Sequence, residues 1–340
     1  MLPLVRYTNI TGDVSQQCVF LEDAMQGDAN LLRVVLAAQF LVSVVVVLVN
    51  VYTIAAIWPR RKRRSTQSQL FVLQLALADV LCGLSRIFTV IFSMDCGLAE
   101  MAATSELVCV VPLVFTVFTW TLSATTLAAI AVDRYVCIVH SLRYYEFMKT
   151  RRVIAILAGL WVFSMLCSGL YLTTWQWVEG RYCEDQNLIP LWHLLAVQIP
   201  ITVLVLVVVT VTHVTIRREA QRHAARSNPG WGPDKHANSA SVRSAKITIL
   251  VVASFVMCYL PMQIFQVLCY FDEDEFTSWD FFVFEMFTGL WYLLNPFIYA
   301  WKNASIREDM VVLWRRIFRR CVREQDVRDP PTPPHGARRF

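Results

Sequence analysis

The sequence Asn295-Pro296-Phe297-Ile298-Tyr299 lies near the end of the last long apolar stretch, and Asp133-Arg134-Tyr135 lies at the end of another. A polar Asn, a helix-breaking Pro and an ionisable Asp–Arg pair are each costly in or beside a lipid bilayer. A chain that keeps these residues there is expected to use them. The two motifs therefore indicate a helical membrane protein with polar functional residues inside its bundle.

Seven apolar stretches are long enough to cross the hydrocarbon layer of a bilayer, which is roughly 30 Å thick. The chain of 340 residues is 56% hydrophobic and 17% charged, and its mean hydropathy is +0.48, which excludes a soluble domain of that size. We predict an all-α membrane protein, a seven-transmembrane helix bundle, with spans at 34–57, 69–94, 107–131, 153–174, 189–213, 246–270 and 281–301.

The predicted bundle, with its connections, occupies residues 34–302. An extracellular N-terminal segment at 1–33 precedes it, and this segment carries the N-glycosylation sequon Asn9-Ile10-Thr11. A short cytoplasmic amphipathic helix is expected at 303–320, followed by a disordered tail at 321–340.

The distribution of basic residues sets the orientation. Arginines and lysines gather in the first, third and fifth connections and in the tail, whereas the other connections are poor in them. By the positive-inside rule the N-terminus is extracellular and the tail is cytoplasmic, as in a multi-pass plasma-membrane protein. The net charge of +5 belongs to this inner face, so the expected partners are anionic lipids and not nucleic acid.

The seven spans and the two motifs together resemble the rhodopsin-like (class A) G-protein-coupled receptors over roughly residues 34–320. Further polar and proline residues stand where that family has its anchors: Asn50, Asp79, Trp161, Pro200 and Pro261. The resemblance implies a receptor that binds an extracellular ligand and activates a heterotrimeric G protein, and it implies no enzymatic activity. For Asn50 and Trp161 we expect a role in helix–helix adhesion.

The resemblance also assigns several cysteines. Cys109 and Cys183 match the family's disulfide between the third span and the second outer loop. Cys18, Cys96 and Cys269 also lie on the oxidising side, and their pairing stays open. Cys321 follows a basic amphipathic stretch, which suits palmitoylation, although a free thiol is the alternative.

Asp79 is an intramembrane carboxylate, and such residues are functional candidates. In relatives it holds a sodium ion together with residues that match Ser123 and Asn295. Trp291 and Tyr292 stand where small polar residues are usual. Two alternatives therefore remain, a sodium site or a protonated Asp79 hydrogen-bonded to Asn50 and Asn295. No other cofactor or metal is expected.

The resemblance implies a two-state activation switch. Arg134 pairs with Asp133 at rest and turns inward when the sixth helix swings out, and Tyr299 stabilises the open form. The remaining switch residues are Tyr135, Phe255, Tyr259, Pro261, Asn295 and Pro296. Many relatives have an acidic partner for this Arg on the sixth helix, but the segment Ser239-Ala240-Ser241-Val242-Arg243 contains no acid, so we expect raised basal activity.

The outer half of the bundle supplies the candidate ligand pocket. Thr116 occupies the place of the aminergic Asp and Gly289 that of the retinal Lys, so a monoamine salt bridge and a retinal Schiff base are not expected. Aromatic and amide groups suit a peptide or a modest polar molecule. The candidates are Thr116, Trp120, Trp192, His193, Gln198, Tyr259, Gln263, Gln266 and Glu285.

Glu285 lies in an outer mouth rich in carboxylates, and an ionised Glu there must be paired or wet. One interpretation makes Glu285 the anchor of a cationic ligand. The alternative is a Glu285 that pairs with Arg86, or that hydrogen-bonds His193 or Gln263.

We therefore expect a basic or amidated peptide ligand. Gln69–Asp79 and Gln263–Gln266 are loosely similar to segments of vasopressin-type and gonadotropin-releasing-hormone-type receptors. An alternative is a chemosensory receptor for small odorants. A different class, a seven-span transporter or channel, would require a charged pore or inverted repeats, and the sequence contains neither.

Overall fold

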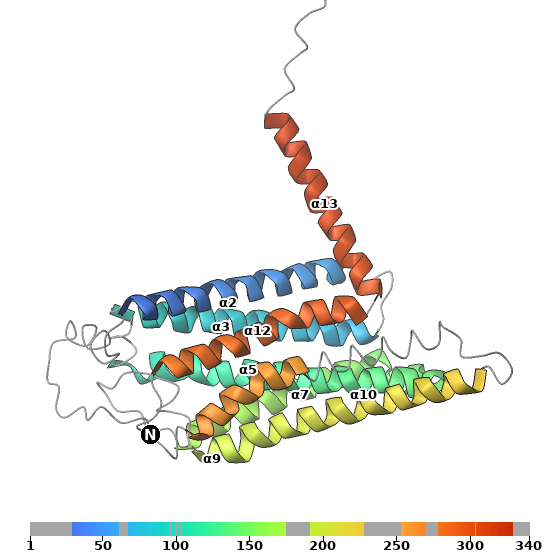
Figure 1. Ribbon diagram of the computed structural model, residues 1–340, viewed down its shortest axis with the longest axis horizontal. Coiled ribbons are helices and arrows are strands. Elements are labelled where there is room, and N and C mark those ends of the chain that lie inside the picture. Colours follow the sequence, from blue (N-terminus) through green and yellow to red (C-terminus); the bar gives the residue numbers. More distant parts are fainter. Residues whose placement is uncertain are drawn as a thin grey trace, which may run out of the picture.

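A computed structural model describes residues 29–60, 67–94, 97–98, 101, 104–174, 191–227, 253–268, 278–302 and 304–328. Within these ranges the secondary structure is helical, without strands. Figure 1 shows the long helices running side by side along the length of the molecule, while the last one, α13, turns away from the end of the bundle. The arrangement is the predicted all-α bundle.

Seven helices in the described part of the chain account for the predicted spans. They are α2 (Ala29–Ile57), α3 (Gln67–Met94), α5 (Glu106–Val139), α7 (Thr150–Leu170), the run α9–η4–α10 (Leu191–Ser227), the helix Ala253–Leu268 and α12 (Ser278–Lys302). Short connecting helices are η1 (Trp58–Arg60), η2 (Ser141–Arg143), α6 (Tyr144–Phe147) and η3 (Tyr171–Thr174).

Two predicted boundaries are too early. The third span was expected to end at residue 131, but α5 continues to Val139 and is 34 residues long. At about 1.5 Å per residue it measures roughly 51 Å, well beyond the thickness of the hydrocarbon layer. Asp133-Arg134-Tyr135 therefore lies within a continuous helix and not at its end. The amphipathic helix α13 (Ala304–Arg328) likewise passes residue 320, where the tail was expected to begin.

The share of buried residues identifies the centre of the bundle. In the most apolar part of α5 61% of the residues are buried, against 22% for α7 and 28% for α2. Large apolar side chains such as Leu41 on α2 and Leu166 on α7 are exposed, which fits helices that face lipid. Functional groups carried by α5 consequently lie inside the bundle.

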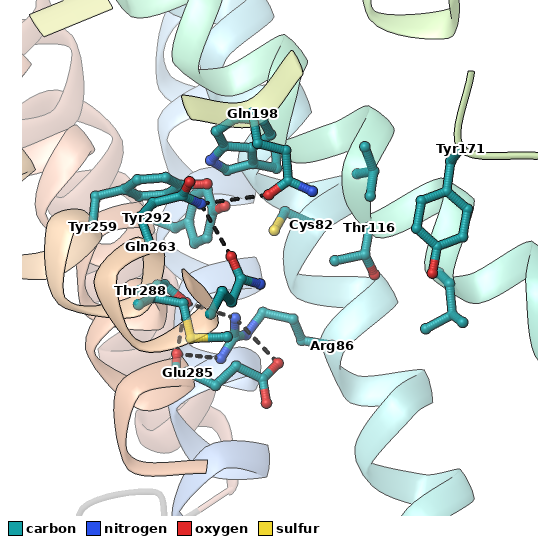
Figure 2. Close-up of a pocket in the computed structure, with 15 residues that line it drawn as sticks. Cys82, Arg86, Thr116, Tyr171, Gln198, Tyr259, Gln263, Glu285, Thr288 and Tyr292 are labelled. Atoms are coloured by element: carbon teal, nitrogen blue, oxygen red, sulfur yellow. Dashed lines mark hydrogen bonds and ion pairs between the residues drawn. The ribbon is translucent and has the colours of Figure 1, made fainter. Parts of the chain in front are cut away.

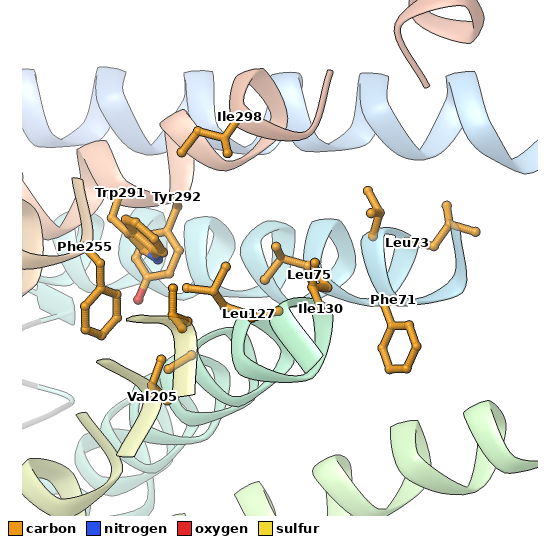
Figure 3. Close-up of a cluster of buried hydrophobic side chains, with 14 of the residues drawn as sticks. Phe71, Leu73, Leu75, Leu127, Ile130, Val205, Phe255, Trp291, Tyr292 and Ile298 are labelled. Atoms are coloured by element: carbon orange, nitrogen blue, oxygen red, sulfur yellow. The ribbon is translucent and has the colours of Figure 1, made fainter. Parts of the chain in front are cut away.

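The core is a continuous apolar cluster between the helices. Figure 3 shows Phe71, Leu75, Leu127, Ile130, Val205, Phe255, Trp291, Tyr292 and Ile298 within it. Polar bonds between helices accompany this packing: Trp161 Nε1 donates to Gln74 Oε1 at 3.3 Å, and Asn50 Nδ2 donates to the Tyr292 carbonyl at 3.3 Å. These bonds link α7 to α3 and α2 to α12.

The fifth span is not a uniform α-helix. The three-residue α9 (Leu191–His193) passes into a π-helical turn, η4 (Leu194–Gln198), before α10 (Ile199–Ser227) begins. π-helical turns have i→i+5 hydrogen bonds and are frequent at functional sites. His193 and Gln198 are five residues apart, and this turn brings them into contact.

Candidate functional site

A cavity of about 80 Å³ lies in one half of the bundle, between α3, α5, the fifth span, the helix Ala253–Leu268 and α12. Its lining combines aromatic, amide, hydroxyl and charged side chains. Figure 2 shows the cavity, which is lined by Cys82, Arg86, Leu113, Thr116, Val117, Trp120, Tyr171, Gln198, Tyr259, Met262, Gln263, Gln266, Glu285, Thr288 and Tyr292.

The structure brings most of the predicted pocket residues together. Thr116, Trp120, Tyr259, Gln263, Gln266 and Glu285 all line the cavity, as does Gln198. Trp192 and His193 are not among the residues that line this cavity. His193 is completely buried and turns toward α7, where its Nε2 lies 3.0 Å from the Cys167 carbonyl oxygen. The ring of Trp192 packs edge-on against that of His193, with the ring centroids 5.6 Å apart.

Glu285 and Arg86 form a buried ion pair across the cavity. Arg86 Nη1 lies 3.4 Å from Glu285 Oε1, and the two side chains are 7% and 11% exposed. The same guanidinium donates to Thr288 Oγ1 at 3.0 Å and to the Glu285 carbonyl at 2.6 Å. Gln39 Nε2 on α2 donates to the other carboxylate oxygen. The sequence left open whether Glu285 pairs with Arg86, with His193 or Gln263, or with a cationic ligand. In the structure it pairs with Arg86, so a cation from the protein itself already neutralises Glu285.

A chain of polar groups leads from α7 to the cavity. A carbonyl oxygen only accepts hydrogen bonds, so His193 Nε2 donates to Cys167 O, and a neutral imidazole that donates through Nε2 accepts through Nδ1. Gln198 Nε2 lies 3.5 Å from that Nδ1, and Gln263 Nε2 donates to Gln198 Oε1 at 3.4 Å. The Cys167 carbonyl thus sets the direction of every bond up to Gln263.

An aromatic stack extends from the cavity into the core. The Trp120 and Tyr259 rings are stacked with their centroids 5.4 Å apart, and Tyr259 stacks in the same way on Phe255 at 5.4 Å. Phe255 meets Trp291 edge-on at 5.2 Å. The predicted switch residues Phe255 and Tyr259 therefore connect the cavity with α12, one turn before Asn295-Pro296.

A second polar cluster surrounds Asp79 on α3, which is fully buried. Ser123 Oγ donates to one carboxylate oxygen at 2.6 Å, and Asn295 Nδ2 donates to the other at 2.9 Å. The Oδ1 atom of Asn295 is buried and accepts no hydrogen bond from any described residue. Sodium binds oxygen ligands, and this cluster offers carboxylate, hydroxyl and amide oxygens, so its donor set fits that ion. Asn50 bonds to Val46 and Tyr292 through its Nδ2 atom, where the sequence had suggested Asp79.

At the other end of the bundle Asp133 is held by three groups. It accepts hydrogen bonds from Ser68 Oγ at 2.6 Å and from the Tyr144 hydroxyl at 2.9 Å, and Arg134 Nε lies 3.8 Å away. Burial raises the pKa of the Tyr144 hydroxyl above its usual range, which keeps it protonated as a donor. Asp133 is completely buried, whereas the Arg134 side chain is 26% exposed. Tyr135 stacks edge-on against His140 at 5.7 Å.

Several predicted residues fall outside the described parts of the chain. These are the glycosylation residue Asn9, Cys18, Cys96, Cys183, Cys269, the segment 239–243, and the side chains of Tyr299 and Cys321. Cys109 is buried and disulfide-bonded, and its expected partner Cys183 is among those residues. Pro261 lies within the helix Ala253–Leu268, and Pro296 within α12.

Sequence reasoning missed Ser68, Tyr144 and Gln39. Gln39 carried a usable signal, because a polar residue within an apolar span faces the bundle interior. Ser68 and Tyr144 carried no such sequence signal, because no motif or spacing in the sequence links either residue to Asp133.

The model of a protein family described as seven-transmembrane receptors of the rhodopsin family matches residues 49–299. The chain belongs to this family. It is a G-protein-coupled receptor and not an enzyme, and family membership excludes the transporter or channel alternative. The membership also implies a multi-pass plasma-membrane protein.

The receptor resembles several known receptors at low identity. It is 28% identical to the RYamide receptor of Drosophila melanogaster over 57% of its own length but only 45% of that receptor's length. It is 25% identical to the substance-K receptor of Canis lupus familiaris over 84% of this chain and 75% of that one. The receptor is also 25% identical to the human adenosine receptor A2a, over 87% of this chain and 73% of that receptor.

Proposed function

We propose that the receptor binds an extracellular peptide in the cavity beneath its outer face and activates a heterotrimeric G protein through its cytoplasmic end. The observation that carries the proposal is the cavity itself, which is lined by amide and aromatic groups next to the Trp120–Tyr259 stack. Two relatives, the RYamide and substance-K receptors, are peptide receptors. The basic inner connections support an extracellular N-terminus and contacts with anionic lipid.

A cell-based screen tests this function. Cells that express the receptor and a G-protein reporter with broad coupling are exposed to pools of basic and amidated peptides, to adenosine and to small odorants. We expect a saturable response to peptides that is absent from untransfected cells. A response confined to adenosine or to odorants would overturn the peptide assignment while leaving the receptor function intact.

The first prediction concerns basal activity. The segment 239–243 offers no carboxylate to pair with Arg134, so one restraint on the resting state is missing. Ser241→Glu should therefore lower ligand-independent signalling several-fold, for a partly exposed ion pair worth on the order of 1 kcal/mol. Reporter output is compared at equal surface expression. Ser241→Gln is the matched control, and an equal decrease with Gln would show that charge is not the cause.

The second prediction concerns sodium. We propose that Asp79, Ser123 and Asn295 hold a sodium ion in the resting receptor, on the strength of their oxygen atoms and the unpartnered Asn295 Oδ1. Replacing sodium with choline in the buffer should then raise agonist affinity for the wild type and leave Asp79→Asn unaffected. Unchanged affinity in the wild type would mean that Asp79 is only a hydrogen-bonded core residue.

A further inference from the structure

His193 does not line the cavity, yet it begins a line of hydrogen bonds that ends there. Its ring is completely buried, and the rings of Tyr171 and Trp192 pack edge-on against it, each with its centroid 5.6 Å away. The contact between His193 and Gln198 depends on the π-helical turn η4, because residues on one face of a regular α-helix are three or four apart and not five. The backbone of the fifth span is thus shaped so that these two side chains meet.

A backbone carbonyl fixes the direction of this line at its α7 end. His193 Nε2 lies 3.0 Å from the Cys167 carbonyl oxygen, which only accepts, so the proton is on Nε2. A neutral imidazole costs far less at a completely buried site than a charged one, so Nδ1 carries no proton and accepts. Gln198 therefore has to turn its Nε2 toward that nitrogen, at 3.5 Å, and its Oε1 away from it.

Each following amide is constrained in the same way. Gln263 Nε2 donates to Gln198 Oε1 at 3.4 Å, a contact drawn as a dashed line in Figure 2, and to Gln266 Oε1 at 3.3 Å. Reversing the Gln263 amide would bring its oxygen against the oxygens of both neighbours. The present direction leaves Gln263 Oε1 buried without a donor among the described residues, so the direction is not set by Gln263 itself. It is set at His193.

Gln266 is the residue at which the line reaches the cavity. It lines the cavity and is half-buried, whereas Gln263 is only 6% exposed. Its oxygen accepts from Gln263, and its Nε2 donates to no described residue. Reversing the Gln266 amide would place two NH₂ groups against each other. The N–H groups of Gln266 are therefore left for whatever occupies the cavity.

We infer that His193 is a positioning residue that, from outside the cavity, makes Gln266 a hydrogen-bond donor toward the ligand. The ligand presents an acceptor there, such as the carbonyl oxygen of a peptide bond. Hydroxyl groups in the lining, such as that of Thr116, donate or accept as they rotate, whereas Gln266 cannot reverse unless the whole line back to His193 reverses. The inference rests on the proposed peptide receptor function and adds the kind of contact that the peptide makes at Gln266.

The test uses three probes on the full-length purified receptor in lipid nanodiscs. Thiobenzamide keeps the N–H groups of benzamide but replaces its carbonyl oxygen with sulfur, a weak acceptor, and methyl benzoate keeps the carbonyl oxygen but has no N–H. Binding is measured by surface plasmon resonance against empty nanodiscs, and folding is checked by the melting curve. Wild-type receptor should bind benzamide at least about threefold more tightly than thiobenzamide, which is within the range of one net hydrogen bond. Methyl benzoate should bind like benzamide.

Variants assign this acceptor preference to the two residues. Gln266→Leu removes the donor, and His193→Phe removes both ring nitrogens but keeps a flat ring, so each should bring benzamide and thiobenzamide to equal affinity. The double variant should show no further change, because both residues act on one contact. His193→Gln keeps a donor and an acceptor and should keep the preference. If His193 served packing alone, its replacement would weaken all three probes together and leave their ratios unchanged.

Two matched controls carry the same chemical changes elsewhere. His213→Phe lies in a buried position of α10, roughly 30 Å further along the fifth span at about 1.5 Å per residue, and Gln221→Leu lies in an exposed position of α10. Neither residue lines the cavity, so both variants should show the wild-type preference. His193→Leu replaces His193→Phe, with the same expectation, if the melting curve shows that the Phe variant is not folded.

Four results would each overturn the inference. They are equal binding of benzamide and thiobenzamide to the wild type, a preference that survives Gln266→Leu, a preference that survives loss of the imidazole from folded receptor, and no binding of benzamide to folded wild type. If peptides activate the receptor but one of these results is obtained, the role of His193 is wrong and the peptide receptor stands. If the preference depends on both residues but no peptide activates signalling, the role of His193 stands and the peptide assignment fails.

Discussion

Receptor that carries Arg134→Ala should reach the cell surface in normal amounts and fail to activate a G protein. The structure explains the normal folding, because Asp133 keeps its hydrogen bonds from Ser68 and Tyr144 when the guanidinium is removed. The Arg134 side chain is 26% exposed and lies 3.8 Å from Asp133, so little packing is lost. Signalling is lost because the N–H groups of this guanidinium are expected to make their contacts in the active state, when the cytoplasmic end of the bundle is open.

Two further variants sharpen this prediction. Arg134→Lys keeps the positive charge but loses the planar set of donors, so it should retain only part of the signal. Asp133→Ala removes the carboxylate that accepts hydrogen bonds from Ser68 and Tyr144, so this variant should have a lower melting temperature. Arg134→Ala and Arg134→Lys should not. Signalling is measured by nucleotide exchange at equal surface expression. Full activity of Arg134→Ala would show that this residue is not the switch.

The second large effect concerns the ion pair between Arg86 and Glu285. Glu285→Gln leaves the guanidinium of Arg86 buried without its counter-charge, and breaking a buried pair on one side costs about 3–5 kcal/mol. Arg86→Met should cost a similar amount. We expect each single variant to melt at a markedly lower temperature and to reach the cell surface in reduced amounts.

The double variant Arg86→Met with Glu285→Leu separates charge from packing. Replacing both partners of a buried pair with apolar side chains is often neutral, so the double variant should regain most of the stability lost by either single one. Glu219→Gln is the matched control, because the Glu219–Arg222 pair at 3.3 Å involves an Arg side chain that is 69% exposed, and such pairs contribute about 0–1 kcal/mol. Additive losses in the double variant would contradict a direct interaction between Arg86 and Glu285.

Sequence reasoning succeeded where a residue type is rare in its surroundings. Asp79, Ser123 and Asn295 stand out as polar groups within apolar spans, and the family resemblance groups them. In the structure Ser123 and Asn295 donate hydrogen bonds to the two carboxylate oxygens of Asp79, at 2.6 and 2.9 Å. The family itself was also predictable, since Asp133-Arg134-Tyr135 and Asn295-Pro296 occur in the right order on the right spans.

The partners of charged groups were harder to predict, because spacing along one chain does not determine contacts between helices. Arg86 and Glu285 are 199 residues apart, and whether they meet depends on how α3 and α12 are rotated about their own axes. The same reason explains why Ser68 and Tyr144 were missed as partners of Asp133. The end of α5 was placed too early because the charged residues Asp133 and Arg134 interrupt the apolar run, although the helix continues past them through Tyr135–Val139.

The π-helical turn η4 also changes how the fifth span must be aligned. A regular α-helix advances by about 100° per residue, and a π-helical turn accommodates one additional residue. The residues that precede Leu194 are therefore rotated about the helix axis by roughly one residue step, compared with their positions in a regular α-helix extended back from Pro200. A gap-free alignment of this span with a receptor that lacks the turn would pair residues that face different neighbours. Comparison of outer fifth-span positions between receptors consequently requires a one-residue gap within Leu194–Gln198.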